Sequence, residues 1–347
     1  MQSLTKFYMW PIWVVQPFGM SKSFAANPIL GSRLLNRFGL HALRVMAAHG
    51  ASRLRWFLLK WQVPRHLRLT YEAQGFVVVP EFLKAPEFAA LGRQIDTLQD
   101  CEVRQCIQGD TLTRRVLLDE EAMQKLPSAG KLIDDPLFER LLSFCAANRK
   151  RPLHYLQKIC NGAASGAADP QKNLHADTFH PTMKSWFFLD DVDADRGPFT
   201  FVPGSHRLTR ERLAWEYRRS LEAAKSADTY SRRGSFRVQG GELKELCLPP
   251  ARALEVKANT LVVANTCGFH CRGAAPSGAE RREIWSFSRT NPFNILPGLG
   301  SKFASRIEYM GAKLYWKWMD RRAEQKGTVS SWHLVPGGAL ADPGNEA

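Results

Sequence analysis

The stretch that decides the fold is Asn173–Arg207, NLHADTFHPTMKSWFFLDDVDADRGPFTFVPGSHR. It begins with His175 and Asp177, continues through an apolar run, and closes on a Pro-Gly turn. Side chains alternate along an extended segment, so His175 and Asp177 project to the same side. Imidazole and carboxylate on one face are two of the three ligands of a His/His/carboxylate facial triad. The stretch therefore predicts two ligands of an iron site.

The third candidate ligand is His270, which follows the apolar strand expected over residues 260–265. Arg281 and Arg282 come 11 and 12 residues later. A guanidinium binds a carboxylate through two parallel hydrogen bonds. One of these arginines is thus a candidate to hold the distal carboxylate of a dicarboxylic cosubstrate beside the metal.

The pattern around this stretch favours a β sandwich or barrel. Short strands with Gly and Pro between them argue against a parallel α/β sheet. We expect strands over residues 75–80, 114–118, 153–160, 184–190, 198–203, 235–238, 253–257, 260–265 and 282–289, and helices over 86–98 and 136–148. The excursion 207–234 carries a helical run, 211–224, and is expected to form a lid over the site.

Four motifs together resemble the phytanoyl-CoA dioxygenase family of Fe(II)/2-oxoglutarate oxygenases, over roughly residues 71–293. They are GFVVVPEFL at 75–83, HAD at 175–177, RGPFTFVPGSHR at 196–207, and GFH at 268–270 followed by arginine at the family's spacing. The resemblance implies a double-stranded β-helix (jelly roll, cupin-like) core, mainly β with flanking helices, in the α+β class. It also implies iron at His175, Asp177 and His270.

The resemblance further implies Fe(II), 2-oxoglutarate and O2 as cofactor and cosubstrates, with ascorbate as an optional reductant. It selects Arg281 for 2-oxoglutarate, with Arg282 on the opposite strand face. The reaction implied is hydroxylation with release of succinate and CO2, and the presence of Asp177 favours hydroxylation over halogenation. Arg272 departs from the family pattern, either as a second carboxylate contact or as a competitor of Arg281.

Other polar residues near these motifs keep open roles. Gln157 either contacts 2-oxoglutarate or makes a hydrogen bond in the core. His180 is expected to be a pocket or structural residue rather than a metal ligand, and His206 is expected to be structural. Within 184–189, one of the two alternating sets of side chains lines the barrel interior, and the pattern does not say which.

Charge is distributed unevenly. The formal net charge is +15, and residues 1–71 contain no Asp or Glu. Such a bias indicates an anionic partner. Residues 30–61 predict two basic helices, one up to Met46 and one from Arg53, which are membrane-surface helices, helices packed on the domain, or part of a cleavable targeting segment. A second basic, aromatic helix is expected over 301–326.

The predicted organisation has four parts: a basic, acid-free helical appendage (1–70), the oxygenase domain with its insertion (71–293), the basic C-terminal helix region (294–336), and a disordered tail (337–347). The seven cysteines are scattered, which fits reduced thiols in the cytoplasm. No stretch reaches the ~20 apolar residues of a membrane span. We expect a cytoplasmic protein, with peripheral contact to an anionic inner membrane face left open.

The leading hypothesis is a hydroxylase acting on a small or lipid-like substrate: a lipid, an acyl thioester or a lipid-linked sugar. The alternative is a catalytically silent jelly-roll adaptor that binds a membrane surface or a protein partner. No nucleic-acid motif accompanies the positive charge, so no nucleic-acid partner is expected. The primary substrate and the oligomeric state are not determined by the sequence.

Overall fold

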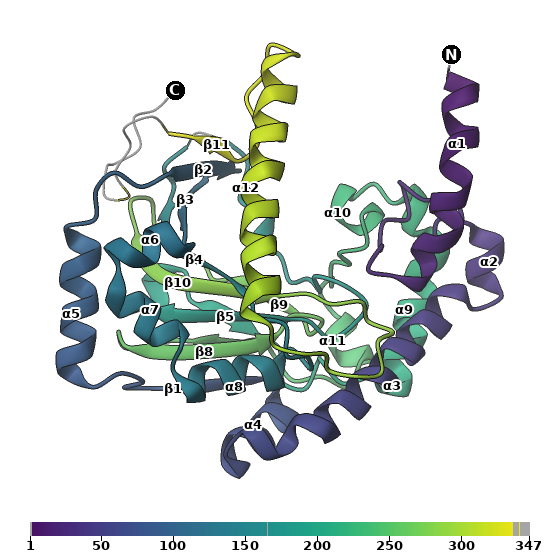
Figure 1. Cartoon of the computed structure of the whole chain (residues 1–347). Coiled ribbons are helices and arrows are strands. Elements are labelled where there is room, and N and C mark those ends of the chain that lie inside the picture. Colours follow the sequence, from purple (N-terminus) through teal and green to yellow (C-terminus); the bar gives the residue numbers. More distant parts are fainter. Residues whose placement is uncertain (1, 165, 336–339, 341–347) are drawn as a thin grey trace.

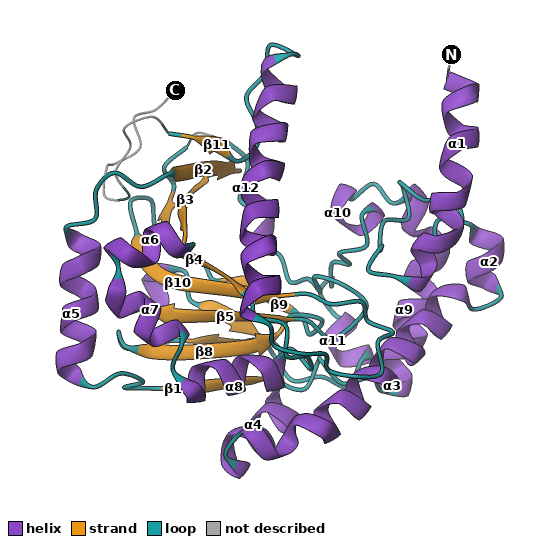
Figure 2. Cartoon of the chain, in the orientation of Figure 1, coloured by secondary structure: helices purple, strands orange, loops and turns teal. Residues whose placement is uncertain are grey.

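A large antiparallel sheet forms the centre of the computed structural model, which describes residues 2–164, 166–335 and 340 (Figure 2). The long antiparallel pairing of β10 with both β4 and β5 fixes its middle. In spatial order the strands are β1 (Phe76–Val79), β8 (Thr260–Asn265), β5 (Met183–Phe188), β10 (Glu280–Ser288), β4 (Leu153–Asn161), β3 (Thr111–Leu117), β2 (Val103–Gln108) and β11 (His333–Leu334).

A second, smaller sheet faces the first. Its strands are β7 (Arg252–Leu254), β6 (Phe199–Phe201) and β9 (His270–Arg272). Single bridges extend it, because His175 pairs with His270 on one side and with Arg237 on the other. The arrangement confirms the predicted jelly-roll core with flanking helices. The predicted strand 235–238 is reduced to this one bridge, because only Arg237 finds a pairing partner there.

Alternation along β5 shows which side chains face the second sheet. Trp186 and Phe188 belong to the aromatic cluster between the sheets, together with Phe199 and Phe201 of β6. Phe187 points the other way and packs in the core under the helices. The set Lys184, Trp186 and Phe188 therefore lines the interior, a choice that periodicity alone left open.

Helices cover the outer face of the large sheet (Figure 1). Their apolar residues join the outer face of the strands in one cluster, which includes Leu91, Phe138, Leu142 and Phe187. The helices are α4 (Arg65–Gln74), α5 (Ala85–Asp96), α6 (Glu120–Lys125), α7 (Pro127–Ile133) and α8 (Pro136–Cys145).

The N-terminal segment contains α1 (Gln2–Val15), α2 (Arg33–Arg37) and α3 (Leu40–Leu59). Two helices do lie within residues 30–61, but the predicted break between Met46 and Arg53 is wrong: α2 and α3 are separated at residues 38–39, and α3 continues past Arg53. Its buried side chains recur every three or four residues, through Ala48, His49 and Ser52. This packing continues across the expected break, which contains Gly50. A Cβ built at Gly50 would meet no atom within 4 Å outside the local helix backbone. The packing offsets the roughly 1 kcal/mol that a helical glycine costs.

Two of the basic residues in α3 are structural donors. Arg44 is buried and donates to the carbonyls of Pro17 and Ser21 at 2.7 and 2.6 Å. Arg55 is buried and donates to the carbonyl of Ala147 at 2.7 Å. Part of the positive charge of the N-terminal segment therefore ties that segment to itself and to the domain.

The insertion after β6 contains α9 (Arg210–Glu222), α10 (Thr229–Arg232) and α11 (Glu242–Glu245), and the C-terminal part contains α12 (Lys302–Glu324). The helices α1 and α12 both project from the body in the same direction (Figure 1). Within the described ranges, no helix is long and apolar enough to cross a membrane. The predicted disordered tail, apart from residue 340, lies outside the described residues.

Candidate metal centre

Three predicted ligands converge at one edge of the second sheet. His175 N donates to His270 O at 3.0 Å and His270 N donates to His175 O at 2.9 Å. Directly paired residues in antiparallel strands project their side chains to the same face. Asp177 lies two residues after His175, so its carboxylate reaches the same space. One ligand atom from each of the three residues lies within 4.8 Å of the others.

Backbone carbonyls hold both imidazoles in the orientation that a metal needs. His175 Nδ1 lies 2.8 Å from Asn173 O, and His270 Nδ1 lies 2.9 Å from Gly268 O. A carbonyl oxygen only accepts, so each Nδ1 carries the proton and each Nε2 carries the lone pair. The Nε2 atoms both lie 3.8 Å from oxygens of Asp177. Orientation by carbonyls is the usual support of histidine ligands.

The protonation states also fit a divalent metal. Burial lowers the pKa of His270 to about 4, against the opposing effect of Asp177. Burial and the neighbouring His270 hold the pKa of His175 well below its usual value. Both rings are therefore neutral at neutral pH, as metal binding requires. Burial would raise the pKa of Asp177, but Lys184 and the two imidazoles hold it well below the ordinary value.

The donor set is two neutral imidazoles and one carboxylate on one face, which is the ligand set of non-haem Fe(II) oxygenases. In the described part of the chain, no other group of three His, Cys, Asp or Glu side chains has this geometry. His180 and His206 stay outside it. His180 Nδ1 lies 3.1 Å from Pro181 O, and both rings are buried.

The model of the phytanoyl-CoA dioxygenase (PhyH) family matches residues 71–270. The chain belongs to the phytanoyl-CoA dioxygenase family. Membership confirms the predicted enzyme class, an iron- and 2-oxoglutarate-dependent oxygenase, and its cofactors. No curated protein matches the chain.

Several solved structures are similar in fold. The epimerase SnoN, in complex with Fe3+, alpha ketoglutarate and nogalamycin RO, is 20% identical, with 64% of this chain and 81% of that chain covered and a TM-score of 0.42. HygX from Streptomyces hygroscopicus, with nickel and 2-oxoglutarate bound, is 16% identical, with 65% and 86% covered and a TM-score of 0.40. The carbocyclase SnoK from nogalamycin biosynthesis is 18% identical, with 71% and 91% covered and a TM-score of 0.40. At these values the likeness does not extend to substrate.

The predicted cosubstrate residues belong to one buried polar chain on the inner face of the large sheet. Arg281 Nε donates to Glu283 Oε2 at 3.0 Å, and its Nη1 donates to the carbonyls of Arg196 and Gly197. Gln157 donates to the other oxygen of Glu283. Arg281 and Gln157 are thus brought together, and Glu283 joins them. The period of two along β10, which places residues 281 and 283 on one face, could have identified Glu283 from the sequence.

The neighbouring arginines have distinct partners. Arg272 Nη1 lies 2.7 Å from Asp169 Oδ2, so its charge is compensated inside the fold. Arg282 lies on the outer face, where it forms ion pairs with Asp190 at 2.9 Å and with Asp96 at 2.6 Å. Arg272 and Arg281 both face the interior, and Arg281 is the one that shares Glu283 with Gln157.

Three cationic residues close to the triad were missed by the sequence analysis. Lys184 Nζ lies 2.7 Å from Asp177 Oδ2. Lys22, from the N-terminal segment, donates to the backbone oxygen of Asp177. Burial lowers the pKa of Lys22 to about 8, which still leaves it protonated at pH 7. Arg237 pairs with His175 through the backbone. Lys22 gave no local signal, because 155 residues separate it from Asp177.

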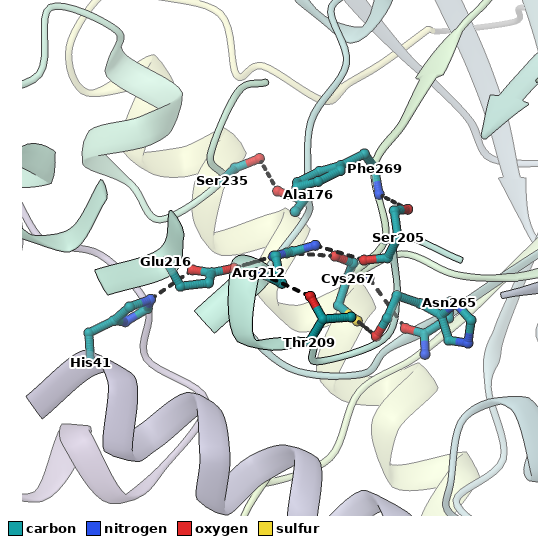
Figure 3. Close-up of polar contacts among 12 residues, drawn as sticks. His41, Ala176, Ser205, Thr209, Arg212, Glu216, Ser235, Asn265, Cys267 and Phe269 are labelled. Carbon is teal, nitrogen blue, oxygen red and sulfur yellow. Dashed lines mark hydrogen bonds and ion pairs between the residues drawn. The ribbon is translucent and has the colours of Figure 1, made fainter. Parts of the chain in front are cut away.

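A buried charged network joins α3, α9 and the chain that precedes His270 (Figure 3). Arg212 of α9 donates to Glu216 at 2.9 Å and to the carbonyls of Ser205 and Cys267 at 2.8 and 3.0 Å. Glu216 also accepts from His41 of α3 at 2.9 Å. The network therefore fixes the chain just before Phe269 and His270 to both α9 and the N-terminal segment.

Proposed function

We propose that this chain is an Fe(II)/2-oxoglutarate-dependent hydroxylase with His175, Asp177 and His270 as its iron ligands. The observation that carries the proposal is the orientation of the two imidazoles. Each Nδ1 is committed to a backbone carbonyl, so both Nε2 lone pairs face the Asp177 carboxylate. A facial triad of this kind would leave positions on a bound iron open for cosubstrate and oxygen.

The chain's own residues bind and orient the reacting groups. Bound iron would supply the oxygen activation needed to oxidise 2-oxoglutarate to succinate and CO2 and to hydroxylate the substrate. Asp177 contributes negative charge to the centre, since its carboxyl group stays ionised. The aromatic residues Trp186 and Phe199, with ring centroids 4.2 Å apart, close the interior next to His270 and exclude water.

In this proposal Arg281 and Gln157 contact 2-oxoglutarate. Both are buried and face the interior of the jelly roll. Arg281 Nε already donates to Glu283 at 3.0 Å. The distal carboxylate of 2-oxoglutarate therefore either binds Arg281 together with Glu283 or displaces Glu283 from Arg281. The Gln157 amide already donates to Glu283 and accepts from Arg115 Nε at 2.6 Å, so its contact with 2-oxoglutarate replaces one of these core hydrogen bonds.

Turnover without primary substrate tests the proposal. The protein with Fe(II), 2-oxoglutarate and O2 is expected to form succinate, and His175→Ala is expected to abolish both succinate formation and bound iron. His66→Ala is the matched control, because His66 is exposed on α4. Absence of Fe(II) and 2-oxoglutarate binding by the wild-type protein in calorimetry would contradict the proposal and favour the silent adaptor.

A lipid-like substrate and contact with an anionic membrane form the second part of the proposal. Apolar side chains are exposed on several N-terminal helices and on α12, among them Trp61, Phe303, Leu314 and Trp318. Amphipathic helices with such residues and basic neighbours bind membrane interfaces. In this proposal the protein is cytoplasmic and touches the inner membrane face.

The structure reduces the basic charge available on α12. Lys313 forms an ion pair with Asp119 at 2.7 Å, and Arg306 forms one with Glu120. A cavity of about 640 Å3 lies between α12 and the helices α6 and α7. Its lining residues include Met123, Ile133, Phe303, Ile307 and Met310. Its apolar wall is suited to an acyl chain.

Sedimentation with vesicles tests the membrane contact. The protein is expected to pellet with phosphatidylserine vesicles and to stay in the supernatant with phosphatidylcholine vesicles. Leu314→Asp with Trp318→Asp is expected to reduce pelleting at least several-fold, because charge replaces apolar contact area. Equal pelleting of this variant and the wild type would contradict the role of α12.

A further inference from the structure

Arg237 is the cross-strand neighbour of His175, on the side opposite to His270. Ala176 N donates to Phe236 O at 3.0 Å, and Val238 N donates to Leu174 O at 2.9 Å, so Arg237 stands directly opposite His175. Ser235 Oγ adds a hydrogen bond to Ala176 O at 2.8 Å (Figure 3). Because directly paired residues share a face, the Arg237 side chain projects to the side that His175 and His270 occupy.

The guanidinium of Arg237 has no acceptor within the described part of the chain. Its Nη1 and Nη2 atoms are both buried and make no hydrogen bond there. One face of the group lies over the Tyr230 ring, at 4.5 Å from its centroid. The nearby carboxylate of Asp228 accepts from the backbone of Tyr230 and Ser231 instead. A buried cation without an acceptor is destabilising, so this geometry is suited to an anion that arrives with a ligand.

Lys22 brings a second positive charge to the same place. Its Nζ donates to the backbone oxygen of Asp177, which is a neutral acceptor. The backbone around Lys22 is locked to the segment that carries Arg237. A Cβ built at Gly234 would lie 2.2 Å from Lys22 O, and Phe24 N donates to Arg232 O at 3.0 Å. The segment that carries Lys22 is therefore held against the segment that carries Arg237.

Arg237 and the proposed cosubstrate residue approach the metal centre from different sides. Arg237 stands beyond His175 in the paired row. Arg281 bonds to Gly197, and the adjacent Pro198 accepts from Gly273, three residues after His270. A cosubstrate held by Arg281 thus lies on the His270 side. The His175 side is left for a different molecule.

We infer that Arg237 and Lys22 bind an oxyanion, a carboxylate or a phosphate, that the primary substrate carries close to its reacting carbon. The inference rests on the proposed function and narrows its substrate class to anionic molecules. 2-Oxoglutarate also carries carboxylates, so the test distinguishes an oxyanion of the primary substrate from a carboxylate of the cosubstrate.

The test titrates inorganic phosphate into the full-length protein loaded with Mn(II) and 2-oxoglutarate, with heat as the readout. The wild type is expected to bind phosphate. Arg237→Met is expected to raise the Kd about 10- to 100-fold, as loss of a charge-assisted hydrogen bond does. Lys22→Met raises it in the same direction, and Arg237→Lys has an intermediate effect, which shows that the site still folds. Arg233→Met is the control, because Arg233 is exposed on the same segment.

Three results would overturn the inference. The first is no phosphate binding by the wild type, and the second is an equal Kd in Arg237→Met and Arg233→Met. The third is a rise in the Kd of 2-oxoglutarate in Arg237→Met that equals the rise for phosphate, since this assigns the subsite to the cosubstrate. In all three cases Mn(II) and 2-oxoglutarate still bind the wild type, so the proposed function stands. Absence of both Mn(II) and 2-oxoglutarate binding by the wild-type protein would instead contradict the proposed function.

Discussion

Replacing Glu216 by glutamine tests the charged network that joins α3, α9 and the chain before His270. Burial by itself would raise the pKa of Glu216. The opposing effect of Arg212 and His41 is larger, and the pKa falls from the ordinary 4.5 to about 2. At about 1.4 kcal/mol per pH unit, this difference corresponds to a stabilisation on the order of 3 kcal/mol. Loss of one partner from a buried ion pair typically costs roughly 3–5 kcal/mol, which is a similar magnitude.

The sign of the pH dependence follows from the direction of the shift. Because folding lowers the pKa of Glu216, its stabilisation is complete above about pH 4.5 and is lost as the pH falls toward 2. Urea unfolding followed by tryptophan fluorescence measures it, and the buried Trp215 reports from beside the network. At pH 7 we expect Glu216→Gln to lower the free energy of unfolding by roughly 3 kcal/mol. The gap to the wild type should narrow below pH 4.5.

Glu245→Gln is the matched control, because Glu245 pairs with Arg218 at 3.5 Å on the exposed surface. Exposed pairs contribute up to about 1 kcal/mol, so this variant should change little. Equal losses of stability in Glu216→Gln and Glu245→Gln would refute this role of the Glu216 network. A loss in Glu216→Gln that is the same at pH 7 and pH 3 refutes it as well.

Three further substitutions test other parts of the structure. Arg281→Met is expected to raise the calorimetric Kd of 2-oxoglutarate about 10- to 100-fold and to lower stability to urea, because Glu283 is left buried without its ion pair; an unchanged Kd would assign Arg281 to structure alone. Gly234→Ala is expected to cost roughly 1–3 kcal/mol in the free energy of unfolding, because its φ of +81° and the contact with Lys22 both oppose a side chain. Gly311→Ala, in the same assay, should stabilise α12 by roughly 0.5–1 kcal/mol, because no atom lies within 4 Å of its Cβ position; a loss of stability there would contradict the open surroundings.

Local sequence patterns predicted much of the centre of this protein. The turn residues and short apolar runs indicated an antiparallel β core, and the motif resemblance specified a jelly roll. The two-residue spacing of His175 and Asp177 placed both on one face, and the structure brings His270 to them. These inferences worked because the period of a strand and the φ preferences of Gly and Pro act within a few residues.

Other features depended on packing. Periodicity put Lys184, Trp186 and Phe188 on one face of β5, but only the second sheet shows that this face lies inside. The helix α3 continues past the expected break because buried residues along it pack on the domain.

The sequence by itself determined which residues can hold a metal, because ligand chemistry and alternation are local properties. Only the tertiary structure decided what surrounds that metal. Lys22, 155 residues from Asp177, reaches its backbone. Arg237 stands opposite His175 through a single bridge, and Glu283 engages Arg281. The physical reason is that charge compensation in a buried site depends on through-space distance, which the folded core sets and the chain order does not.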